Sequence, residues 1–203
     1  MIWGVGTGRC GTMSLAKQLG GVHEPGGLGR VMPWMRYGLA CDWESLSLDL
    51  LERSEREVPV IVDPRHSYVI PLIREVDPDA QFVWIYRDPV ECIESWLARG
   101  NWRDGSDDAG TRYSPEGGYP KVWWRFEKGI WFWREVNSRI RRDLMERFQV
   151  VKCPDDLEEH ENANPVGAKV RLSPEEVELV RLDTKWLLGD LDALRERTRG
   201  AVL

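Results

Sequence analysis

The sequence predicts an α/β protein with three layers (α/β/α), in which helices cover both faces of a mainly parallel sheet. Short apolar segments that suit buried strands alternate along the chain with segments of helical period. The first strand leads directly into a glycine-rich turn and a helix, which is typical of a βαβ unit. The length of 203 residues is sufficient for one well-buried domain, so we expect a single domain over residues 1–203.

The first half of the chain predicts three strands with helices between them. Residues 20–38 hold six glycines and two prolines, which predicts an irregular loop without a strand. The predicted elements around this loop are, in order, a strand over 2–6, a helix over 11–19, a helix near 43–56, a strand over 58–63, a helix over 68–76 and a strand within the stretch 80–89, whose last residue is Arg87.

The second half predicts three helices and one further strand. Pro89 opens the first helix, because proline is tolerated in the first helical turn. A polar, glycine-rich stretch over 100–118 predicts a lid or a disordered loop. A long helix over 120–147 and a strand over 148–153 follow. The long helix places on one face, at helical spacing, a stripe that we expect in the core: Phe126, Ile130, Trp133, Ile140 and Leu144.

A capping box predicts where the last helix begins. Ser173 precedes Pro174, and Glu176 stands three residues after the serine. We therefore expect a C-terminal helix over about 173–199.

Composition narrows the classes of partner. The net charge of −6 argues against a nucleic-acid partner that needs a basic surface. No apolar run approaches the roughly 20 residues of a membrane helix, and no targeting segment opens the chain, so we expect a cytoplasmic protein without a membrane partner. The four cysteines form no C-x-x-C pair, which predicts reduced thiols and no structural zinc site.

The glycine-rich turn fits neither of two common nucleotide loops. Gly6, Gly8 and Gly11 match G-x-G-x-x-G, but a dinucleotide site also needs an acidic residue after a second strand, and residues 20–34 predict no strand. The triphosphate loop needs lysine between Gly11 and Thr12, and none is present. What remains is a strand–turn–helix with one fixed cation, which suits a phosphate-like anion.

Two motifs make a more specific resemblance. The stretch GTGRCGTMSL over 6–15 resembles the phosphosulfate loop [KR]-S-G-T-[TS] of the sulfotransferases that use PAPS, 3′-phosphoadenosine 5′-phosphosulfate. The stretch FVWIYRDPVECIESW over 82–96 resembles that family's 3′-phosphate motif, R-[DN]-P-x-[DE]-x-x-x-S. Both occur in the family's order, and the resemblance covers about residues 2–157.

The resemblance implies a P-loop-type sulfotransferase fold and the transfer of a sulfonate group from PAPS to a hydroxyl or amine of a small-molecule or glycan acceptor. PAP is then the product, and no metal is required. Cys10 and Met13 stand where the family has hydroxyl residues, and the family's R-K-G run is not found. The nucleotide-binding residues that the resemblance implies are Gly8, Arg9, Cys10, Gly11, Thr12, Met13, Ser14, Arg87 and Ser95.

Three residues are candidates for catalysis. Arg9 stays charged, so it can stabilise the charge that develops on the departing phosphate. For the base there are two alternatives. His66 lies close to where cytosolic members of the family place a histidine, and an imidazole titrates near neutral pH. Glu24 lies in the loop after the first helix, where other branches of the family use a glutamate.

Two rival functions remain open from the sequence. The strand that ends in Asp63 resembles one that holds magnesium in a P-loop kinase, although the lysine of such enzymes is missing here. A non-catalytic nucleotide-binding protein with the same fold is the second rival, because a fold does not guarantee activity.

Overall fold

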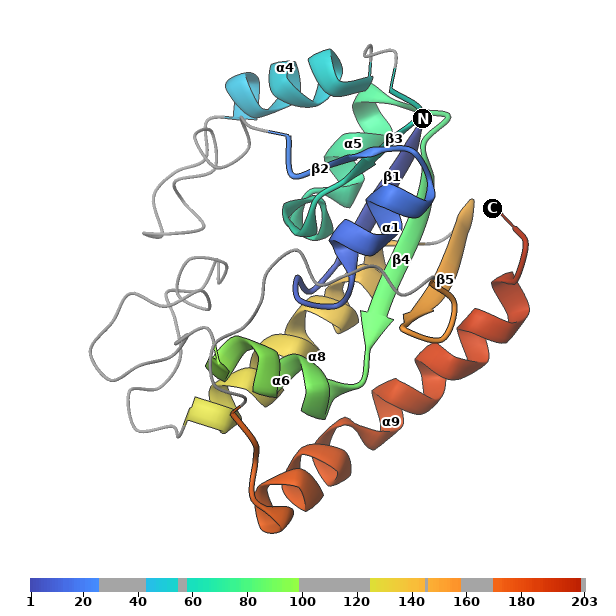
Figure 1. The fold of residues 1–203 in the computed structure, drawn as a ribbon. Coiled ribbons are helices and arrows are strands. Elements are labelled where there is room, and N and C mark those ends of the chain that lie inside the picture. The colour runs from blue at the N-terminus through green and yellow to red at the C-terminus, as the bar shows by residue number, and fades with distance from the viewer. Residues whose placement is uncertain (26–42, 55–57, 99–124, 145, 158–169, 202–203) are drawn as a thin grey trace.

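A computed structural model describes the chain in six stretches: residues 1–25, 43–54, 58–98, 125–144, 146–157 and 170–201 (Figure 1). The predicted loop over 100–118 and most of the predicted loop over 20–38 lie outside these stretches.

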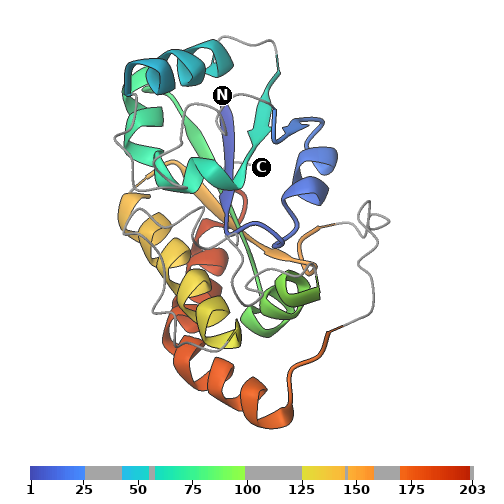
Figure 2. The same cartoon turned by 90° about the vertical axis from the view of Figure 1, so that its left-hand side faces the viewer.

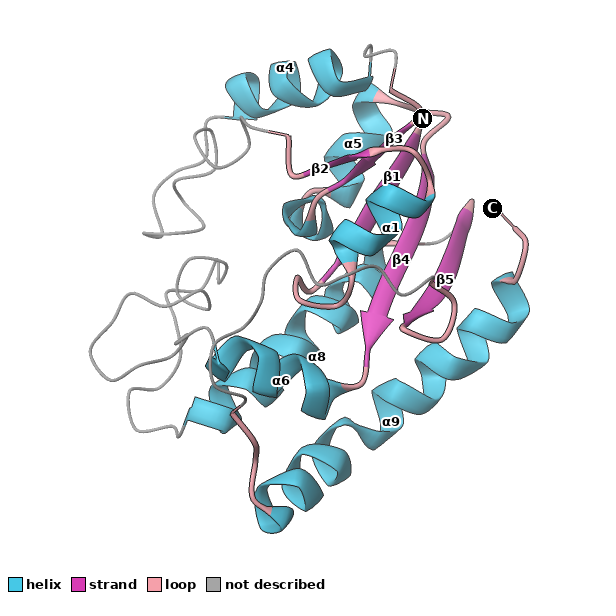
Figure 3. Cartoon of the chain, viewed as in Figure 1, coloured by secondary structure: helices cyan, strands magenta, loops and turns pink. Residues whose placement is uncertain are grey.

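A parallel sheet of five strands forms the centre of the described chain (Figure 3). The strands stand in the order β2-β3-β1-β4-β5, and each neighbouring pair is parallel. Their bounds are Ile2–Gly6 for β1, Val22–His23 for β2, Val60–Val62 for β3, Gln81–Arg87 for β4 and Phe148–Cys153 for β5. The prediction of an α/β protein with a mainly parallel sheet is therefore confirmed.

Helices lie on both sides of this sheet (Figures 1 and 2). Helix α1 covers one face, whereas α5 and α8 lie on the other (Figure 2). The helices are α1 (Thr12–Gln18), α4 (Trp43–Ser54), α5 (Ile70–Val76), α6 (Pro89–Ala98), α8 (Arg125–Asp143) and α9 (Pro174–Thr198), together with the short 3₁₀ helix η1 (Pro64–Tyr68).

The burial of β4 follows from this layering. Its five central residues, Phe82 to Tyr86, are all buried, as expected for a strand covered on both faces. Trp84 donates from its indole nitrogen to Oδ1 of Asn137 on α8 at 3.1 Å, so the N–H group of this buried ring has a hydrogen-bond acceptor. The predicted apolar stripe of α8 lies in the core, with Ile130, Trp133, Ile140 and Leu144 buried and Phe126 half-buried.

One prediction about the sheet is wrong. Residues 20–38 were expected to hold no strand, but Val22–His23 pairs with β3 as a two-residue strand. Gly21 permits the approach, because a Cβ there would lie 2.6 Å from the Val60 carbonyl oxygen. A strand this short shows no alternating pattern in the sequence, and its position is set by its partner.

The strand order also bears on the dinucleotide alternative. That fold places its second strand beside the first, in the order 3-2-1-4-5-6. Here β3 lies between β1 and β2. The dinucleotide fold is therefore excluded by the topology, although the reason taken from the sequence, the lack of a second strand, does not hold.

Two element boundaries also differ from the expected ones. The helix predicted over 68–76 is preceded by η1, and α5 begins only at Ile70. The long helix α8 ends at Asp143 instead of 147, and Arg147 has a left-handed φ of 52° just before β5 begins, so it is not helical. Within the described chain, no helix is both long and apolar enough to cross a lipid bilayer.

Candidate functional site

The turn after β1 has an unusual backbone. Gly8, Arg9 and Gly11 all have positive φ, at 74°, 55° and 101°. The left-handed region costs a glycine little, but it is uncommon for a residue with a Cβ such as Arg9. Such outliers cluster at ligand sites, so the conformation of Arg9 points to function.

This turn lies directly on the central strands. A Cβ on Gly6 would lie 2.6 Å from the carbonyl oxygen of Ile85 on β4, and a Cβ on Gly11 would lie 2.6 Å from Sγ of Cys153 on β5. No side chain fits at either position, which explains why glycine occupies both. The turn is thereby held at the carboxyl edge of the sheet, where parallel α/β sheets bind ligands.

Helix α6 brings the second motif against the first. Nε of Arg9 donates to Oγ of Ser95 at 3.1 Å, across 86 positions of the chain. One turn earlier on α6, the Cys92 thiol donates to the carbonyl oxygen of Arg9 at 3.8 Å. The two motifs that the sequence singled out thus meet at one place.

Arg87 lies at the end of β4, at the same edge of the sheet. Its Nε donates to Oε2 of Glu91 on α6 at 2.7 Å, and both side chains are partly exposed. Its carbonyl oxygen accepts from the indole nitrogen of Trp133 at 3.2 Å, which ties the strand end to α8. In this arrangement Arg87 contacts Glu91 and Ser95 contacts Arg9, so a phosphate shared by Arg87 and Ser95 stays a prediction.

The remaining loop residues have different surroundings. Cys10 is fully buried beneath the turn, since a Cβ on Gly6 would lie 2.8 Å from its sulfur. Burial raises the pKa of its thiol to about 11, so the thiol stays protonated at neutral pH. It contributes shape and a backbone amide to the loop, whereas Met13 and Ser14 are half-buried in the first turn of α1.

Thr12 connects the loop to the predicted base Glu24. Its hydroxyl lies 3.0 Å from Nε2 of His23, and the same nitrogen lies 3.5 Å from Oε1 of Glu24. Glu24 has a positive φ of 46°, and its amide donates to the Val62 carbonyl oxygen at 2.9 Å. Its side chain is 50% exposed. The structure therefore brings Glu24 to the first turn of α1, beside the loop.

His66, the other predicted base, lies in the interior. Its ring has no exposed surface and packs edge-on against Trp3, with centroids 4.9 Å apart. Nδ1 lies 3.3 Å from the Gly4 carbonyl oxygen, and Nε2 has no hydrogen-bond partner among the residues that the structure describes. Burial lowers the pKa of the ring to about 4. The ring is therefore neutral at pH 7 and shielded from solvent.

Asp63 is surrounded by arginine side chains, whereas a carboxylate that binds a metal ion needs its oxygens open to the cation. Its carboxylate accepts from Nε and NH2 of Arg65 at 2.7 and 2.6 Å, and NH1 of the buried Arg53 lies 3.7 Å away. Burial alone would raise the Asp63 pKa, but attraction to His66 and the hydrogen bonds from Arg65 hold it below its ordinary value. Two arginines already neutralise this carboxylate, which disfavours the kinase reading.

The sequence analysis missed several neighbours of the site. Ser67 fastens the end of β1, because its hydroxyl accepts from the Gly6 amide and donates to the Gly6 carbonyl oxygen, both at 2.9 Å. Glu91 and Cys92 contact Arg87 and Arg9, respectively. His23, which the sequence suggested only as a residue that orients Glu24, contacts that carboxylate. Ser67 adjoins His66, and Glu91 and Cys92 lie within the motif over 82–96, but only the fold shows these contacts.

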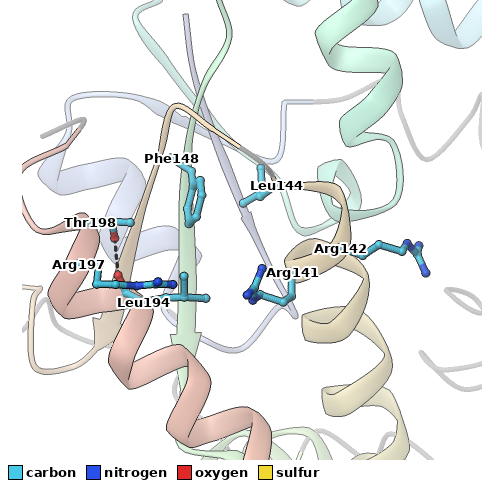
Figure 4. A pocket seen from close by; sticks show the side chains of 7 residues that line it. All are labelled: Arg141, Arg142, Leu144, Phe148, Leu194, Arg197 and Thr198. Carbon is cyan, nitrogen blue, oxygen red and sulfur yellow. Dashed lines mark hydrogen bonds between the residues drawn. The ribbon is translucent and has the colours of Figure 1, made fainter.

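A separate hollow of about 610 Å³ lies at the other edge of the sheet, near the start of β5 (Figure 4). Its lining residues are Arg141, Arg142, Leu144, Phe148, Leu194, Arg197 and Thr198. The arginines stand in the last turns of α8 and α9, where cations offset the negative end of a helix. Arg141 also pairs with Asp190 at 2.7 Å. These roles account for the arginines without a ligand.

Comparisons with known proteins give no match. No family model fits the sequence, no curated protein resembles it, and no solved structure matches it. The functional argument therefore rests on the residues of this chain and on their arrangement.

Proposed function

We propose that this protein is a sulfotransferase with the P-loop-type sulfotransferase fold, which moves a sulfonate group from PAPS to a hydroxyl or amine of a small-molecule or glycan acceptor. One observation carries the proposal: the hydrogen bond of 3.1 Å between Arg9 and Ser95, which joins the two nucleotide motifs. The two motifs lie 86 positions apart in the chain, and this contact brings their side chains together, as the binding of one nucleotide by both motifs requires.

The chemistry needs few protein groups. The acceptor oxygen or nitrogen forms a bond to sulfur while the bond from sulfur to the 5′-phosphate oxygen breaks, and PAP leaves with the electron pair. Arg9, beside the carboxyl end of β1, is placed to neutralise the charge that grows on the departing phosphate. The acceptor proton passes to a base. Positioning and electrostatic stabilisation supply the remainder.

Glu24 is the base that the geometry favours. Half of the Glu24 side-chain surface is exposed, whereas His66 exposes none. Thr12 and His23 link Glu24 to the loop through contacts of 3.0 and 3.5 Å, which hold it near the place where the sulfonate would sit. His23 is then a positioning residue.

Nucleotide binding is the first test. Calorimetric titration with PAP in the absence of magnesium is expected to show binding to the wild-type chain. Arg87→Ala removes a charge-assisted contact to the 3′-phosphate and should weaken binding by about 1.5–3 kcal/mol, or roughly 10- to 150-fold. Arg147→Ala is the matched control, because Arg147 is an exposed arginine at the other edge of the sheet. Equal affinity of the Arg87 variant and the wild type would overturn the 3′-phosphate assignment.

Turnover is the second test. Labelled PAPS is incubated with a panel of hydroxylated metabolites and glycans. Once an acceptor is found, Glu24→Gln should lose most of the rate at saturating PAPS, whereas folded His66→Asn should retain it. The reverse result would return the role of base to His66. Binding of PAP without turnover on any acceptor would favour the non-catalytic alternative.

A further inference from the structure

Helix α9 carries a continuous apolar stripe on its exposed side. Leu179, Leu182 and Trp186 are 51%, 72% and 57% exposed. The exposed Gly189 and Ala193 continue the same stripe toward the C-terminal end of the helix. The successive steps of three and four residues are the heptad pattern of a helix that packs against another helix.

The opposite side of α9 already packs against the protein. Its buried residues are Val180, Thr184, Leu187, Leu191 and Leu194. Helix α9 runs along the outer edge of the fold (Figure 1). The exposed stripe is therefore additional to the side that holds the helix in place, and a stripe of large apolar side chains left in water marks an interaction surface.

We propose that this stripe is the contact surface of a homodimer, in which α9 packs antiparallel against α9 of a second copy of the chain. The occupant is inferred from two properties of the stripe itself, the alternation of large and small side chains and the distribution of charges along one edge.

The sizes of the side chains fit this pairing. In an antiparallel pair related by a two-fold axis between Leu187 and Leu188, Trp186 faces Gly189 of the second copy. In the same register Leu182 faces Ala193. Trp186 and Leu182 thus each meet a small residue, so the two helices can approach closely there, whereas Leu179 faces Glu196 at the end of the contact. A parallel pair would place Trp186 against Trp186 and glycine against glycine, which leaves one crowded layer and one empty layer.

The charges along one edge of the stripe fit as well. The exposed Glu178 and Lys185 occupy the N-terminal half of this edge, and the partly exposed Asp192 and the exposed Arg199 occupy the C-terminal half. The two-fold axis brings Glu178 opposite Arg199 and Lys185 opposite Asp192. On this edge, all four flanking contacts of the symmetric pair therefore join opposite charges, which favours the pairing.

On the other edge, Asp183 and Asp190 of the two copies approach each other. Each is already neutralised within its own chain, by Arg134 at 2.8 Å and by Arg141 at 2.7 Å. The stripe spans only four turns of helix, so the area that it can bury is small compared with the 1,200–2,000 Å² that stable dimers bury. We therefore expect a reversible dimer that dissociates on dilution, with a dissociation constant on the order of micromolar.

Sedimentation equilibrium of the full chain over about 1–100 μM tests the proposal. The wild type is expected to shift from monomer to dimer across this range, and Leu182→Glu is expected to remain monomeric. Leu48→Glu is the matched control, since Leu48 is 55% exposed on α4, and it should dimerise as the wild type does. A wild type that stays monomeric, or a dimer that Leu182→Glu does not weaken, overturns the proposal.

A charge exchange tests the antiparallel register. Glu178→Arg and Arg199→Glu each place like charges opposite each other in the proposed pair, so each should weaken the dimer severalfold. The double variant restores opposite charges and should recover the wild-type constant. If the dimer of the double variant is weakened by as much as the two single changes added together, this register is contradicted. Circular dichroism is the control for folding. Because the altered side chains are exposed, each variant is expected to be folded.

Discussion

At the scale of the residue, His66 shows how far neighbours decide the chemistry of a side chain. Its sequence position, close after a strand and 21 residues before Arg87, suggested a base. Its burial depends on Trp3 and Gly4, which lie more than 60 positions away. The residue type and place could be predicted from the sequence, but the low pKa could not, because burial is a property of the assembled core.

The buried ring makes stability depend on pH. In the unfolded chain the ring binds a proton below about pH 6.5, whereas in the folded chain it does so only below about 4. The unfolded state therefore binds more protons in this window, and the free energy of unfolding falls as the pH drops through it. Between pH 7 and about 4.5 the contribution of His66 amounts to about 2–3 kcal/mol.

His66→Asn removes the titrating group but retains an amide that can donate to the Gly4 carbonyl oxygen. Urea unfolding at both pH values is expected to show a smaller loss of stability in this variant than in the wild type. The same pH dependence in both proteins would mean that other groups cause it.

Under the proposed function, Glu91 affects nucleotide binding through its ion pair with Arg87. The pair of 2.7 Å must loosen before Arg87 can contact a phosphate fully. Because both side chains are partly exposed, the pair contributes at most about 1 kcal/mol. Under the proposed function, Glu91→Gln should bind PAP up to about fivefold more tightly by calorimetry. Weaker binding in this variant would show instead that Glu91 holds Arg87 in its binding orientation.

At the scale of the element, local signals could be predicted from the sequence and nonlocal ones could not. The start of α9 is encoded in four consecutive residues, and the structure contains the expected capping box, with Ser173 accepting from the Glu176 amide and Glu176 accepting from the Ser173 amide. The strand β2 has no such local code, since it exists through its pairing with β3. The contact between Arg9 and Ser95 belongs to the second kind, because the family resemblance implied only that both residues bind one nucleotide and did not pair them.

The capping box makes a prediction for stability. Ser173→Ala leaves the first turn of α9 without its side-chain acceptor and should lower the free energy of unfolding by about 1 kcal/mol. Ser173→Asp supplies another acceptor at the same position, so it should unfold at nearly the wild-type urea concentration. If alanine and aspartate behave alike, the serine hydroxyl is not what stabilises this end of the helix.

At the scale of the whole molecule, the sheet gathers every predicted nucleotide residue of the described chain at one edge. The turn after β1, the end of β4 and the start of α6 come together there because β1 and β4 are parallel neighbours, with Gly6 in register with Ile85. A parallel sheet could be predicted from the alternation of elements. The order of its strands could not, because pairing between distant segments leaves no local pattern in the sequence.

A ligand that binds this edge should stabilise the whole domain. PAP at about 100 times its dissociation constant adds about 2.7 kcal/mol to the free energy of unfolding, which corresponds to a rise of roughly 5–10 °C in Tm. The proposed function predicts this rise without magnesium. ATP with magnesium should give a smaller one, and the opposite ranking in a thermal unfolding experiment would favour the kinase.

The central place of β1 also has a consequence for synthesis. This strand is made before both of its neighbours, and its partner Val60 follows Ile2 by roughly 60 residues, or about 3–12 s at ordinary rates of translation. During that time its apolar residues have no strand to pair with, and β4 and β5 arrive later still. The central strand of the sheet is therefore made before its other strands and is among the last parts to be enclosed, which makes the nascent chain, more than the finished protein, vulnerable to aggregation.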